Sequence, residues 1–102
     1  MILAGGDPTR LGDPVELVRT ALAESLVRTR ALEAGLAYEL IAARADLTPI
    51  VVAARRSLPE PDVRTLRGWR RELVGAELLE LLAGRRRLGV GPGGRVAVSD
   101  AP

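Results

Sequence analysis

Arginine side chains gather around one short stretch of this 102-residue chain, where they are suited to bind phosphate groups. Arg64, Arg67 and Arg71 have the spacing i, i+3, i+7, which places them on one face if the stretch is helical. Gly68 lies among them and lets a phosphate approach the backbone, and arginine binds phosphate through two parallel hydrogen bonds. The full set of candidate phosphate contacts is Arg55, Arg56, Arg64, Arg67, Gly68, Arg70, Arg71, Arg85, Arg86 and Arg87.

The charge is unevenly distributed, which favours a local anionic partner. All 15 basic residues are arginine, 13 residues are acidic, and the formal net charge is +2. Residues 55–95 hold ten arginines against five acids, whereas residues 1–54 hold five arginines against seven acids. We therefore expect RNA or DNA as the partner, contacted through phosphates, with an acidic protein surface as the alternative.

The sequence offers few residues that could carry out catalytic chemistry. The chain has no Cys and no His, so thiol, disulfide and imidazole chemistry and ordinary zinc sites are excluded. Glu77 and Glu80 stand three residues apart and could hold a cation weakly, but exposed helix carboxylates at this spacing usually pair with arginine. We expect no catalytic site, no metal and no cofactor, and hence no enzyme activity of the chain alone.

Two further features have a structural and a functional interpretation. Trp69, the single tryptophan, could stack on a base, but a lone tryptophan is more often a core anchor. Gly89, Gly91 and Gly94 match the spacing of a dinucleotide-binding loop, but a strand-like stretch follows them, so a turn is expected. Residues 85–87 could contact phosphate or only stabilise the C-terminal end of a helix.

The hydrophobic pattern predicts a helical domain over residues 13–87, after a flexible lead-in at 1–12 and before an extended or hairpin arm at 88–102. Asp13 and Pro14 favour the start of a helix that runs to about residue 34, and Gly35 favours its end. Its predicted apolar stripe is Val15, Val18, Leu22, Ser25 or Leu26, Thr29 and Leu32.

Shorter helical segments are expected further along. One covers residues 37–43, one begins at a cap on Asp46 or Thr48 and runs to about 56, and a single turn follows a cap on Asp62. The last helix runs from Trp69 to about residue 83, and Gly75 either bends it or admits a close neighbour. The expected core residues of these helices are Leu47, Ile50, Val51, Ala54, Leu73, Leu79 and Leu82.

Two stretches carry a family resemblance. Residues 66–84 read LRGWRRELVGAELLELLAG, and residues 30–46 read RALEAGLAYELIAARAD. The first resembles the Gly-Trp-Arg-Arg-Glu segment and the leucine-rich helix end of the C-terminal region of ribonuclease D. The second resembles the long helix, the turn and the next helix start of the same family, so the resemblance extends over roughly residues 14–90. It differs at residues 36–38, where the family's turn usually has proline.

The resemblance implies an all-α, HRDC-like bundle of about five helices that binds nucleic acid or positions it for an attached enzyme. RNA is then favoured over DNA, and a separate exonuclease or helicase chain is a further expected partner. The family's exonuclease domain, with its four metal-binding acids, has no counterpart in these residues, so no nuclease role is carried over. We expect a fragment, a truncated product or a free-standing module, and a helical protein-interaction module is the alternative.

The expected location is the cytoplasm. No apolar stretch approaches the ~18 residues needed to cross a membrane, and the first residues lack the basic start of a signal peptide. The absence of Cys is consistent with a reducing compartment. We therefore expect no membrane partner.

Overall fold

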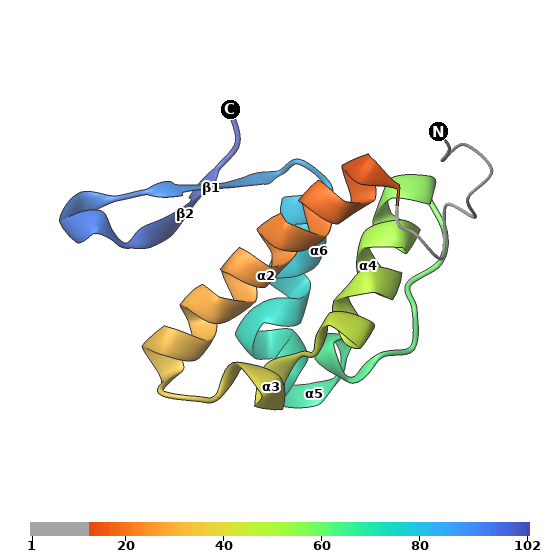
Figure 1. Ribbon diagram of the computed structural model, residues 1–102, viewed down its shortest axis with the longest axis horizontal. Helices are drawn as coiled ribbons and strands as arrows, with labels where there is room; N and C mark the ends of the chain where they lie inside the picture. Colours follow the sequence, from red (N-terminus) through yellow and green to blue (C-terminus); the bar gives the residue numbers. More distant parts are fainter. Residues whose placement is uncertain (1–12) are drawn as a thin grey trace, which may run out of the picture.

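The computed structural model describes residues 13–102, and the expected lead-in at 1–12 lies outside the described residues. The described chain is mostly helical and ends in a two-stranded antiparallel sheet (Figure 1). The α-helices are α2 (Pro14–Ala34), α3 (Tyr38–Ile41), α4 (Arg44–Arg56), α5 (Gly68–Arg70) and α6 (Ala76–Leu82). The remaining elements are the short helical turns η2 (Arg64–Leu66), η3 (Arg71–Gly75, π-helical) and η4 (Pro92–Gly94) and the strands β1 (Arg86–Val90) and β2 (Val96–Asp100). No described helix combines the length and the apolar character that a membrane span requires.

Helix α2 begins and ends where the sequence predicts, but its buried face is not the predicted one. The Asp13 carboxylate accepts a hydrogen bond from the backbone N–H of Val15, and Gly35 ends the helix at φ 69°. The expected stripe of Val15, Val18, Leu22 and Leu32 is exposed. The buried side consists of Glu16, Thr20, Ala23, Leu26, Val27 and Ala31. Both faces have helical spacing, and the face with small residues packs inward because it lets neighbouring helices come close.

The middle helices shift slightly from the expected boundaries. α4 begins at Arg44, and Asp46 lies in its first turn, where its carboxylate accepts a hydrogen bond from the Ala43 N–H at 2.7 Å. Ala53 is buried in place of the expected Ala54. The turn η2 is preceded by Val63 without any side-chain cap, so the expected cap on Asp62 is wrong.

Residues 68–82 form one helical segment that widens into a π-helical turn at η3 (Figure 1). A Cβ added to Gly75 would lie 2.3 Å from the carbonyl oxygen of Thr65. Glycine is therefore required here by close approach of the η2 backbone, which confirms one of its two expected roles. Leu82 is buried as predicted, whereas Leu73 and Leu79 are only partly buried against the core. The core that unites α2, α3, α4, η2, η3 and α6 is built from Leu26, Val27, Ile41, Leu47, Ile50, Val51, Leu66, Val74 and Leu78.

The C-terminal arm is a hairpin formed by β1 and β2. Leu88 lies opposite Val98 and packs with it against the core, whereas Val90, opposite Val96 near the tip, is 77% exposed. The arm is thus anchored at its base and projects from the helical body (Figure 1). The Gly-rich stretch forms its turn, as predicted, and the fold is helical with a small sheet rather than all-α. Arg86 and Arg87 lie in β1 and not at a helix end.

Candidate nucleic-acid interface

Two of the predicted phosphate-binding arginines, Arg55 and Arg56, instead pair with a buried carboxylate. Glu16 is 5% exposed, and its two carboxylate oxygens accept hydrogen bonds from the guanidinium of Arg56 at 2.9 and 3.1 Å. Arg55 lies 2.8 Å from Asp13 and 3.4 Å from Glu16, and its guanidinium lowers the pKa of Asp13. Arg55 and Arg56 therefore join the end of α4 to the start of α2 and are not free for a ligand.

Two more of the predicted arginines cap the C-terminal end of α3. Arg64 donates to the carbonyl oxygen of Glu39 at 2.9 Å, and Arg70 donates to that of Leu40 at 2.8 Å. The buried hydroxyl of Thr65 donates to the next carbonyl, Ile41. Cations and donors at a helix C-terminus satisfy its unpaired carbonyls. Arg64 also contacts the Asp46 carboxylate at 3.1 Å. Arg70 has no carboxylate partner among residues 13–102.

Arg71 and Arg67 differ in how firmly they are paired. Arg71 forms a two-point ion pair with Glu60, at 2.7 and 3.3 Å, and this contact lowers the pKa of Glu60. Among the described residues Arg67 pairs only with Asp62, at 3.4 Å, and both of these side chains are well exposed. An exposed pair of this length is worth little in water, so the charge of Arg67 is available to a ligand.

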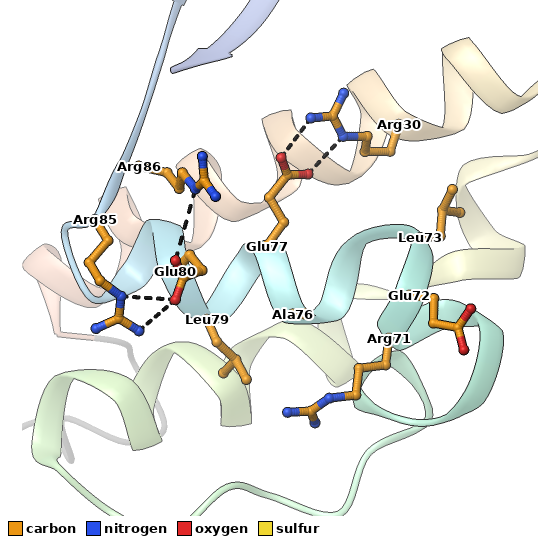
Figure 2. A pocket seen from close by; sticks show the side chains of 10 residues that line it. All are labelled: Arg30, Arg71, Glu72, Leu73, Ala76, Glu77, Leu79, Glu80, Arg85 and Arg86. Carbon is orange, nitrogen blue, oxygen red and sulfur yellow. Dashed lines mark hydrogen bonds and ion pairs between the residues drawn. The ribbon is translucent and has the colours of Figure 1, made fainter. Parts of the chain in front are cut away.

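A hollow of about 710 Å³ lies along α6, and ion pairs line it. Figure 2 shows Glu77 reaching from α6 to the guanidinium of Arg30 on α2, with both contacts at 2.7 Å. Glu80 reaches Arg85 at 2.7 Å and lies 3.9 Å from Arg86, which also pairs with Asp100 across the hairpin. Arg85 lowers the pKa of Glu80. Glu77 and Glu80 thus bind arginine, and no group of metal-ligating side chains occurs in residues 13–102.

Trp69 is exposed at the start of α5, where the sequence predicted a core anchor. Its side chain is 49% exposed, and the guanidinium carbon of Arg70 lies 4.4 Å from its ring centroid. Gly68 has φ +55° and no atom within 4 Å of the position a Cβ would take, so the backbone beside the ring is open. The residues Arg67, Gly68, Trp69 and Arg70 are called the Trp69 surface below. Arg67, Gly68 and Arg70 belong to the predicted set and Trp69 does not, and together the four combine an aromatic face with available positive charge.

Sequence reasoning missed two arginines that line a second groove. Arg28 on α2 and Arg95 beside the hairpin turn both contribute to it. Arg28 lies 4.1 Å from the ring centroid of Tyr38, and neither arginine has a carboxylate partner among the described residues. Arg87 of β1 is likewise without an ion pair in this part of the chain. Arg28 and Arg95 lie outside the Arg-rich motif, and Arg28 has Glu24 four residues before it, so the sequence carries no signal that they are unpaired.

The comparisons with known proteins give one partial match. Ribonuclease D of Gluconacetobacter diazotrophicus is 45% identical over 51 residues, a stretch that covers 44% of this chain and 13% of that protein. No family model and no solved structure matches the chain. Part of the chain is therefore similar to a small part of a ribonuclease D, and the chain spans about an eighth of the length of that relative.

Proposed function

We propose that the chain is an accessory, non-catalytic nucleic-acid-binding domain with an HRDC-like bundle, and that it binds single-stranded RNA at the Trp69 surface. The exposed Trp69 ring beside the available charges of Arg67 and Arg70 carries this proposal. Aromatic rings bind unpaired bases by stacking, and arginines bind the phosphates between them. The partial likeness to ribonuclease D favours RNA over DNA. A separate exonuclease or helicase chain in the cytoplasm would use such a domain to hold its substrate.

The single tryptophan provides a direct test. Titration with a short single-stranded oligouridylate at low salt should quench Trp69 fluorescence, because a stacked base contacts the only indole in the chain. Affinity should fall steeply with salt, by a slope of ~0.7 per phosphate contact for a single strand. An unchanged emission together with no binding by anisotropy of labelled RNA would contradict the proposal.

Substitutions separate stacking from general charge. Trp69→Ala should weaken binding of labelled RNA by ~1–3 kcal/mol, the usual effect of losing one stacked base. Arg67→Gln should reduce the salt slope by ~0.7. Arg85→Gln is the matched control, since it removes the same charge from an arginine that is already paired with Glu80. Equal losses in Arg67→Gln and Arg85→Gln would indicate unspecific attraction instead of a site.

A protein-interaction module is the second candidate, and the outer face of α2 favours it. Val18 and Leu32 are 71% and 70% exposed on the side of α2 that faces away from the core. With Val15 and Leu22, which are also exposed, they form an apolar stripe along the helix, and such a stripe often marks a protein contact. An acidic peptide that binds the chain as tightly as RNA does, and that loses affinity in Val18→Ser, would support this candidate and exclude specific RNA binding.

A further inference from the structure

A second groove lies between α2 and the tip of the hairpin arm. Its volume is about 400 Å³, within the range of small-molecule sites. One wall comes from the C-terminal half of α2, and the other from Gly94, Arg95 and Val96. Figure 1 shows the hairpin arm projecting from the helical body away from α4, and neither Glu16 nor its arginine partners Arg55 and Arg56 line the groove. None of the groove residues belongs to the Trp69 surface.

The charged residues of the groove leave a net positive charge. Arg28 and Arg95 face no carboxylate partner in residues 13–102, and the contact of Arg28 with the Tyr38 ring does not neutralise its charge. Glu33 also lines the groove, but its carboxylate accepts a hydrogen bond from Arg30 at 2.7 Å. Two arginines with free donors form a site for an anion such as phosphate, which guanidinium groups bind with two hydrogen bonds.

The remaining lining adds an apolar surface. Leu32 is 70% exposed and Val96 is 37% exposed, and both border the groove. Gly94 has φ +77° and nothing within 4 Å of the position a Cβ would take, so the tip leaves space beside its backbone. A flat ring could therefore lie against Leu32 and Val96 while its anionic group reaches the arginines. A free inorganic ion would use only the charged half.

We propose that this groove binds one phosphate-bearing nucleotide unit of an RNA strand, with the phosphate at Arg28 and Arg95 and the base against Leu32 and Val96. The choice of RNA rests on the function proposed above, whereas the need for an anion joined to a flat apolar group rests on the groove itself. A strand that occupied both this groove and the Trp69 surface would contact the domain at two separate places. Binding would then depend on strand length.

The test uses the full chain labelled with ¹⁵N and three probes: adenosine 5′-monophosphate, inorganic phosphate and adenosine. The monophosphate should shift the amide signals of Thr29, Leu32, Gly94 and Val96. Inorganic phosphate and adenosine should each bind about tenfold more weakly, since each lacks one half of the interaction. Equal affinity for inorganic phosphate and the monophosphate would overturn the proposal, as would stronger shifts with a hexaglutamate peptide.

Variants identify the groups involved. Arg28→Gln and Arg95→Gln should each lower affinity for the monophosphate by about fivefold, the loss expected for a charge-assisted hydrogen bond at an exposed site. Leu32→Ser should weaken monophosphate binding but leave phosphate binding unchanged. Because Leu32 is exposed, this variant should fold like the parent chain. Arg85→Gln is the control and should change nothing. Monophosphate binding that ignores Arg28→Gln and Arg95→Gln would overturn the proposal.

The two proposals can fail separately. RNA that quenches Trp69 with unchanged affinity in Arg28→Gln and Arg95→Gln would overturn the groove assignment and leave the Trp69 surface intact. Monophosphate that occupies the groove while RNA leaves Trp69 emission unchanged would overturn the function proposed for the Trp69 surface and support the groove.

Discussion

Arg28 and Arg30 stand two residues apart on α2 and have opposite surroundings. Arg30 donates to Glu77 and Glu33 at 2.7 Å, and these carboxylates raise its pKa. Arg28 lies over the Tyr38 ring and has no acidic partner among the described residues. An arginine held at two points by a carboxylate is part of the fold, whereas one without a carboxylate keeps its charge for a ligand. Arg56 and Arg71 are likewise held at two points by one carboxylate. Arg95 has no carboxylate partner in residues 13–102, and Arg67 has only the exposed contact with Asp62 at 3.4 Å.

Among the arginine–carboxylate pairs, we expect the largest loss of stability when the buried Glu16 carboxylate is removed. Glu16→Gln removes the charge that holds Arg55 and Arg56, and we expect the free energy of unfolding to fall by about 2 kcal/mol. Urea denaturation followed by circular dichroism measures this loss. Glu33→Gln is the control on the same helix, because Glu33 is half exposed. Equal losses in the two variants would remove the distinction between buried and exposed pairs.

The adjacent arginines of α2 give the sharpest comparison. Arg30→Gln breaks the two-point contact with Glu77, in which both side chains are about a quarter exposed, and should cost about 1 kcal/mol. Arg28→Gln should leave the free energy of unfolding within ~0.5 kcal/mol of the parent chain, as is usual for exposed substitutions. The same urea denaturation compares both. A larger loss for Arg28→Gln than for Arg30→Gln would show that Arg28 is structural.

Acid should destabilise the fold, because it protonates the carboxylates that pair with arginine. The arginines without a carboxylate partner should not contribute to this loss. Contacts with arginine lower the pKa values of Asp13, Glu60 and Glu80 in the folded chain. The stabilisation is therefore fully present above the ordinary values of 3.8 for Asp13 and 4.5 for the two glutamates, and it is lost as the pH falls through the folded pKa values. Denaturation midpoints measured from pH 7 down to ~2.5 should decline below these values. Higher stability at low pH would contradict the assigned pairs.

Although the expected cap on Asp62 was wrong, local signals in the sequence predicted several other ends of elements, because caps and turns act over a few residues. Asp13, Gly35 and the Gly-rich hairpin turn are examples. The inner face of α2 could not be predicted, since both of its sides carry helical apolar spacing and only the neighbouring helices decide between them. The sequence also could not show which arginines pair with a carboxylate. Arg30 and Glu77 are 47 residues apart, and Arg56 and Glu16 are 40 apart, so their pairing depends on the assembled fold.

The exposure of Trp69 was likewise not predictable from the sequence. A lone tryptophan favours a core position on average, yet the aliphatic core here is complete with Leu66, Val74 and Leu78, all nearly or fully buried. Beside these residues, η2 and η3 approach so closely that a Cβ on Gly75 would lie 2.3 Å from the Thr65 carbonyl oxygen. Trp69 was therefore a candidate in the sequence, but its exposure followed only from the packing around it.

The hairpin arm has a consequence for the dynamics of the chain. Its two strands pair only with each other in the described structure, and an isolated two-stranded hairpin is marginally stable in water. Leu88 and Val98 attach its base to the core, while Val90 near the tip packs against little. The arm can therefore open locally while the helices remain folded, and the backbone amides at its tip should exchange with solvent long before those in the middle of α2.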